Sequence, residues 1–183
     1  VYAVLKSVLE KASGESLERI TQDWLAGPLG MEDTLWRERP AAFAAAQNPT
    51  GLVTSPRDVA RMGQLILDGG RAGGAGRLVS DQQMRALFEP SATNAAYGRL
   101  WWLNGASLSL GVGRRSRIEG PLISAAPSDL RMARGAQDRE LFVSPSRRLI
   151  VVRMGRAAAD PDFDQQLWLR LAKALPGDRP SGG

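Results

Sequence analysis

The 183-residue sequence contains no cysteine and no histidine. Without cysteine the chain can form no disulfide, no thiolate nucleophile and no cysteine-ligated metal site. The lack of histidine excludes a Ser-His-Asp triad, a histidine general base and histidine-ligated metals within the chain. We therefore expect no metal and no other cofactor, and any hydrolytic chemistry must use other groups.

Long apolar runs are also lacking. No stretch approaches the ~18 apolar residues that indicate a membrane-spanning helix, so we expect no transmembrane segment. No secretory signal is visible, but the chain starts at Val1 rather than at a methionine, and a preceding segment could carry one. The arginine-, alanine- and glycine-rich composition suggests a GC-rich, bacterial genome. The sequence leaves both a cytoplasmic and a periplasmic location open.

Positive charge is in moderate excess, with a net charge of +5 and 24 basic residues, of which three are lysines. The densest cluster, Arg114-Arg115-Ser116-Arg117, is flanked by glycine and contains no aromatic residue. Nucleic-acid-binding surfaces commonly combine basic residues with stacking aromatics. We therefore expect a solvated basic loop and no nucleic-acid partner.

Helical periodicity dominates the first half of the chain. Apolar residues recur at helical spacing from Val1 to Ala12, and Gly14 follows as a helix-ending residue. Serine caps predict three further helices, which should end at Gly27-Pro28, at Gly69-Gly70 and at Pro90. The capping residues are Ser16, Ser55 and Ser80.

Two further predictions concern the helix after Ser16 and the segment that precedes the helix after Ser55. The helix after Ser16 should bury an apolar face, and Ala41–Thr50 should be an irregular loop because it shows no regular period. The residues of that apolar face are Leu17, Ile20, Trp24 and Leu25.

From Tyr97 onward the pattern changes to that of β-strands, followed by a closing helix after Asp160-Pro161. Helices followed by antiparallel strands predict an α+β fold. We expect a helical region over residues 1–90, antiparallel strands plus a C-terminal helix over 91–176, and a polar tail over 177–183. The predicted strands are Tyr97–Leu103, Leu130–Arg134, Glu140–Val143 and Leu149–Met154, with Ser144–Arg148 as a hairpin turn.

Three stretches of the chain together carry a family resemblance. They are LAGPLGMEDT at Leu25–Thr34, GLVTSPRDVARMGQLILDGG at Gly51–Gly70, and DLRMARGAQDRELFVSPSRRLIVVRMG at Asp129–Gly155. The chain resembles, from Tyr2 to about Leu175, the serine hydrolases of the β-lactamase / penicillin-binding-protein superfamily. Its closest likeness is to the class C β-lactamase-like branch, with esterases, D-amino peptidases and 6-aminohexanoate-dimer hydrolases. The resemblance implies a partial β-lactamase-like fold.

The chain lacks the two motifs that would supply the chemistry of that family. Its members attack the substrate with the serine of S-x-x-K and are assisted by the tyrosine of Y-x-N. Neither motif occurs here, so we expect the chain to begin just after the tyrosine motif and to be catalytically silent by itself. The residues three positions before the lysines are Ala3, Val8 and Arg170, and those two positions after the tyrosines are Val4 and Arg99.

The third family motif, K-T-G or a relative, has a partial match at Ala133–Ala136. The resemblance implies that the N–H of Ala136 is one oxyanion donor and that Gly135 allows close backbone approach to the substrate. Arg134 then offers a positive charge to a substrate carboxylate, and Gln137 is a weaker candidate for substrate contact. Without the resemblance, the same residues would form a simple β-turn with an Arg134–Asp138 surface ion pair.

Trp101-Trp102 is similar to a pair of tryptophans in the same family. Neighbours in a strand point to opposite faces, so one ring should pack in the core and the other should line the cleft. We take Trp102 as the candidate for substrate contact.

Two functions are consistent with these residues. The first is part of a serine hydrolase that cleaves ester or amide bonds in a small acyl, peptide or β-lactam substrate through an acyl-enzyme. The alternative is a non-catalytic remnant or interaction module that keeps the scaffold. If N-terminal strands and the nucleophile helix are missing, apolar faces should be exposed, which favours self-association or binding of an N-terminal fragment.

Overall fold

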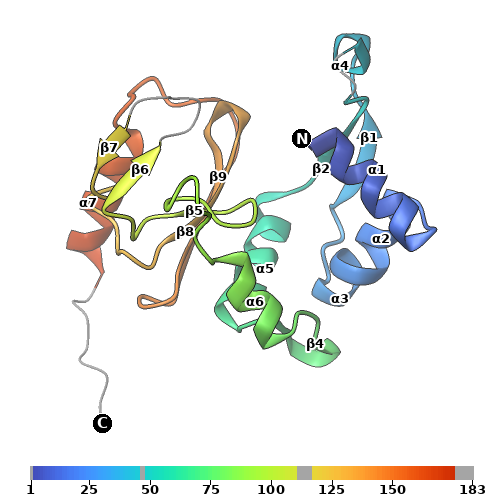
Figure 1. Ribbon diagram of the computed structural model, residues 1–183, viewed down its shortest axis with the longest axis horizontal. Helices are drawn as coiled ribbons and strands as arrows, with labels where there is room; N and C mark the ends of the chain where they lie inside the picture. The colour runs from blue at the N-terminus through green and yellow to red at the C-terminus, as the bar shows by residue number, and fades with distance from the viewer. Residues whose placement is uncertain (1, 46–47, 111–116, 176–183) are drawn as a thin grey trace. The chain divides into compact units, whose positions relative to one another are not determined.

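The computed structural model describes residues 2–45, 48–110 and 117–175. The chain forms two compact units, Val1–Val79 and Ser80–Gly183, which are treated separately below (Figure 1). The helix that follows Ser80, which we had expected within the helical region of residues 1–90, belongs to the second unit.

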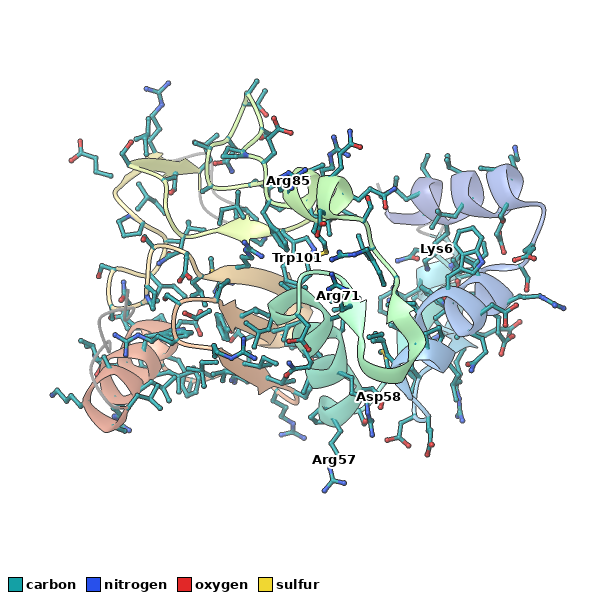
Figure 2. The ribbon with its side chains drawn as sticks, turned by 90° about the horizontal axis from the view of Figure 1, so that it is seen from below. Lys6, Arg57, Asp58, Arg71, Arg85 and Trp101 are labelled. Atoms are coloured by element: carbon teal, nitrogen blue, oxygen red, sulfur yellow. The ribbon has the colours of Figure 1, made fainter. Side chains whose placement is uncertain are left out.

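The first unit opens with α1 (Tyr2–Ser13), which ends at Gly14 in the left-handed conformation (φ +74°), as predicted. On one side of α1, Lys6 (Figure 2) bonds to a later part of the unit. Its Nζ donates to Asn48 Oδ1 at 2.9 Å and to the Thr50 carbonyl at 2.6 Å. The apolar stripe of α1 is instead exposed, with Val4 66% and Val8 54% accessible. An amphipathic helix normally buries such a stripe, so α1 presents an uncovered apolar face.

Ser16 caps the next helix by accepting a hydrogen bond from the Arg19 N–H at 3.3 Å. The helix runs through α2 (Leu17–Thr21), a π-helical turn η1 (Gln22–Ala26) and α3 (Gly27–Leu29). Our predicted stop at Gly27-Pro28 is therefore wrong. Pro28 lies in α3 directly after the π-helical turn, and the helix continues through it to Leu29. The helix ends instead at Gly30, with φ of +64°.

The apolar face predicted for this helix is only partly buried. Ile20 is buried, whereas Trp24 is 57% exposed. The π-helical turn at Gln22–Ala26 shifts the positions that follow Thr21 around the axis relative to a regular α-helix. In this turn Ala26, rather than Trp24, is the buried residue.

An antiparallel hairpin of β1 (Leu35–Glu38) and β2 (Thr50–Val53) was not predicted. Between its strands lies α4 (Ala41–Ala45), so the expectation of a loop over Ala41–Thr50 is also wrong. The strands are short, and polar or glycine residues at Arg37, Glu38 and Gly51 hide the alternating pattern.

Helix α5 (Pro56–Leu67) matches its prediction. Ser55 accepts from the Asp58 N–H at 3.3 Å, and proline takes a first-turn position. Gly69 and Gly70 end the helix with φ of +61° and +87°. The short strands β3 (Arg71–Ala72) and β4 (Gly76–Arg77) follow, joined by the 3-10 turn η2 (Gly73–Ala75).

The second unit begins with α6 (Asp81–Leu87), capped by Ser80 as predicted. Its main sheet has the antiparallel order β10-β9-β8-β5. Three of the strands match predicted strands closely, while the fourth covers only the end of the predicted Tyr97–Leu103. The bounds are β5 (Trp102–Leu103), β8 (Arg131–Gly135), β9 (Arg139–Ser144) and β10 (Leu149–Arg153).

A smaller sheet pairs β6 (Leu108–Leu110) with β7 (Arg117–Glu119). Of the predicted basic cluster, Arg117 is exposed on β7, and residues 114–116 lie outside the described residues, as does the predicted tail of 177–183. Among the described residues, no helix is both long and apolar enough to cross a membrane.

The core of the second unit lies between the main sheet and α7 (Phe163–Ala174), the predicted closing helix. Trp168 of α7 is 1% exposed and meets the ring of Phe142 edge-to-face, with 5.9 Å between the centroids. The remaining buried core residues come from β8 and from the segment before it: Ile123, Leu130 and Met132. This packing fixes β8 and β9, whose connecting bend is the candidate site.

Candidate active site

The candidate site is the bend between β8 and β9, formed by Gly135 and the turn η3 (Ala136–Asp138). Gly135 is extended (φ −112°, ψ 174°), whereas Gln137 has a φ of +60°. An added Cβ at Gly135 would lie 3.2 Å from the Arg139 carbonyl oxygen across the strand pair. Close backbone approach, rather than a left-handed conformation, therefore favours glycine at this position.

Gly135 and Ala136 are both exposed at the end of β8. A main-chain N–H at an exposed strand end can donate to a ligand oxygen without breaking a core contact. The geometry thus allows the oxyanion role predicted for Ala136, which remains a prediction.

Arg134 is held in a network of charges beside the bend. Its Nε donates to Glu140 Oε1 at 2.7 Å, and its Nη2 donates to Asp164 Oδ2 at 2.6 Å. The alternative Arg134–Asp138 ion pair is therefore wrong, and Asp138 lies 3.9 Å from Arg153 instead. A substrate carboxylate would have to share or replace these partners of Arg134, and its predicted role in substrate binding stays a prediction.

Glu140 is the buried member of this network, with 2% exposure. Burial raises the pKa of its carboxyl from 4.5 to about 7, against the opposing charge of Arg134. The negative charge of Asp164 raises it further. Its second oxygen, Oε2, is buried and has no hydrogen-bond partner among the described residues. Such an orphaned oxygen is costly when the group is ionised.

The raised pKa of Glu140 predicts a pH-dependent stability. The folded pKa of about 7 lies above the ordinary value of 4.5, so the stabilisation is complete below pH ~4.5 and is lost as pH rises to ~7. A difference of this size corresponds to about 3 kcal/mol in the free energy of unfolding. Urea unfolding from pH 5 to pH 8 should show this decline, and Glu140→Gln should abolish it.

Glu119→Gln is the matched control, because Glu119 is exposed in the same unit. We expect this variant to keep the decline of the parent chain. A parent free energy of unfolding that stays constant or rises between pH 5 and pH 8 would contradict the assignment to Glu140.

The remaining predicted site residues are Gln137, in the turn η3, and Trp102, on β5. Gln137 is exposed and accepts a hydrogen bond from Arg139 Nη2 at 3.0 Å. Trp102 is half-buried, packs against the core of the second unit and meets Tyr97 edge-to-face, with 4.6 Å between the centroids. Trp101 (Figure 2) is also half-buried and contacts Phe88 at 5.6 Å. Substrate contact by Gln137 or Trp102 stays a prediction.

Two buried polar residues that shape this unit were missed by sequence reasoning. Asn104 is fully buried, and its amide bonds the Ile123 N–H and carbonyl at 2.8 and 2.9 Å. Glu140 lies next to Arg139 at the start of β9, directly before the apolar residues 141–143, so its charge gives no local sign of burial. Asn104 lies two residues after Trp102, where an asparagine predicts a turn and does not indicate burial.

The helices and the antiparallel sheet with its closing helix define the fold class as α+β, as predicted. The family model for beta-lactamase matches residues 1–175. The chain therefore belongs to the beta-lactamase family.

Solved structures of similar fold extend this finding. A beta-lactamase from Mycobacterium bovis aligns with a TM-score of 0.66 and 16% identity, over 94% of this chain and 60% of its own. A putative beta-lactamase from Bacteroides dorei aligns with a TM-score of 0.59 and 14% identity, over 91% of this chain and 53% of its own. Simvastatin synthase (LovD) from Aspergillus terreus aligns with a TM-score of 0.58 and 16% identity, over 93% of this chain and 52% of its own. This chain thus spans between 52% and 60% of the length of these proteins.

Proposed function

We propose that the chain is the C-terminal part of a serine hydrolase that cleaves ester or amide bonds through an acyl-enzyme. Membership of the beta-lactamase family over residues 1–175 supports the hydrolase scaffold. The observation that supports the proposal most is the exposed Gly135–Ala136 bend at the end of β8, which we assign to the place of the family's third motif.

In the proposed reaction, the nucleophile lies in a segment outside these 183 residues. A serine of S-x-x-K would attack the substrate carbonyl carbon, and the carbonyl oxygen would become an oxyanion. The N–H of Ala136 would donate to that oxygen. The alcohol or amine would leave with a proton, and water would then release the acid and restore the serine. The substrate class is a small acyl, peptide or β-lactam compound.

One observation favours the alternative of a non-catalytic remnant or interaction module. The position of the family lysine is Ala133, and the neighbouring positive charge of Arg134 is already paired with Glu140 and Asp164. A site without an available cation would hold a substrate carboxylate weakly. The uncovered apolar face of α1 would in either case favour a second copy of the chain or an N-terminal fragment as partner.

The coding sequence upstream of Val1 separates the two functions. We expect it to encode S-x-x-K followed by Y-x-N in frame, and we expect the longer protein to hydrolyse p-nitrophenyl butyrate or a chromogenic cephalosporin. The serine-to-alanine variant of that S-x-x-K motif is the control and should be inactive. An in-frame stop codon or an unrelated upstream domain would contradict the hydrolase proposal and support the module.

A further inference from the structure

A hollow of the Ser80–Gly183 unit lies at the opposite end of β8 from the Gly135–Ala136 bend. It has a volume of about 460 Å³, within the range of small-molecule sites. Its walls are mostly apolar and include Phe88, Leu103 and Leu130. Because β8 rises about 3.3 Å per residue, Arg131 lies roughly 13 Å along the strand from Gly135. The hollow is therefore separate from the proposed oxyanion site.

Arg131 is the cation of this hollow. Its guanidinium lies 3.9 Å from the centroid of the Phe88 ring, and its side chain is half-buried. It donates no side-chain hydrogen bond to any residue that the structure describes. The guanidinium carries five N–H donors in a fixed fork geometry. The donors of Arg131 are thus available to a ligand.

The surroundings of Arg131 favour an added negative charge. Burial lowers the pKa of its guanidinium from the ordinary value, and the charge of Asp129 acts in the opposite direction. The carboxylate oxygens of Asp129 accept no hydrogen bond from Arg131. Its Oδ2 accepts from the Ser146 N–H at 2.6 Å, and its Oδ1 accepts from the hydroxyls of Ser146 and Ser144 at 3.0 and 3.3 Å. Asp129 therefore stabilises the turn after β9 and does not pair with the guanidinium of Arg131.

We propose that this hollow, named here the Arg131 pocket, binds a small organic monocarboxylate with an apolar body. The carboxylate pairs with the Arg131 guanidinium, whose planar fork matches two carboxylate oxygens. The apolar body lies against Phe88 and Leu103. The nearby charge of Asp129 disfavours ligands of higher negative charge, so a monocarboxylate fits better than inorganic phosphate.

Titration of the 183-residue chain with benzoate, followed by isothermal calorimetry and amide chemical shifts, tests the proposal without any need for catalysis. We expect saturable benzoate binding with shifts centred on Arg131 and Phe88. Benzamide, which has the same shape without the charge, and inorganic phosphate should each bind at least 10-fold more weakly. Failure of this binding says nothing about the hydrolase proposal, and loss of hydrolysis says nothing about the Arg131 pocket.

Three variants sharpen the test. Arg131→Gln removes the charge and should weaken benzoate at least 10-fold, while Arg170→Gln, at an exposed position of α7, should leave its affinity unchanged. Ala106→Phe fills the pocket while it keeps Arg131, so it should also weaken binding even if Arg131→Gln fails to fold. Equal binding of benzoate and benzamide, or unchanged affinity in Ala106→Phe, would overturn the proposal.

Discussion

Replacing Gly135 with valine in the proposed longer protein is expected to lower kcat/KM by about 100-fold to 1,000-fold, the typical effect of losing one oxyanion donor. A valine Cβ would lie 3.2 Å from the Arg139 carbonyl oxygen, and its branched methyl groups would crowd the strand end. The strand would move away from that oxygen, and the N–H of Ala136 would move with it. Steady-state kinetics with the best ester substrate measures the loss.

The same substitution should change folding stability much less than activity, because Gly135 is exposed. Gly74→Val is a matched control, since a Cβ added at Gly74 meets no atom within 4 Å. We expect this variant to keep the parent kcat/KM. A Gly135→Val enzyme with full kcat/KM would show that Ala133–Ala136 does not occupy the place of the K-T-G motif.

Trp168→Ala is expected to destabilise the chain by about 3–5 kcal/mol, a typical cost of truncating a buried aromatic residue. Trp168 is 1% exposed and packs on Phe142, so the change leaves a cavity between α7 and the main sheet. This loss approaches the whole stability of many small domains. Urea unfolding followed by circular dichroism measures it.

Trp24→Ala removes a side chain of the same kind that is 57% exposed. We expect a change within about 0.5 kcal/mol, because little buried surface is lost. If both tryptophan variants lost similar free energies of unfolding, the core of the second unit would not be organised around Trp168.

The parts of the fold that sequence reasoning predicted are those that local chemistry decides. Ser16, Ser55 and Ser80 each accept the backbone N–H expected of a helix cap, because the residues involved are neighbours in sequence. The strands after Leu130 were predicted because their apolar runs are bounded by turn residues. The family resemblance added the position of the bend at Gly135–Ala136.

The parts that were missed depend on contacts between distant residues. The β1–β2 hairpin joins strands separated by a short helix, and its pairing offsets weak strand propensity. Arg134 meets Asp164 across 30 sequence positions, and neither residue carries a local sign of this partnership. Sequence reasoning therefore placed Arg134 beside the bend without finding that its charge is already paired.

We propose that this chain supplies the scaffold and the oxyanion edge of a serine hydrolase, while the nucleophile lies in another segment. Labelling with a fluorophosphonate probe, followed by mass spectrometry, can be done on the 183-residue chain and on the longer protein side by side. We predict no adduct on the chain and one adduct in the longer protein, on the serine of an upstream S-x-x-K motif. A covalent adduct on any serine of the 183-residue chain would contradict the claim.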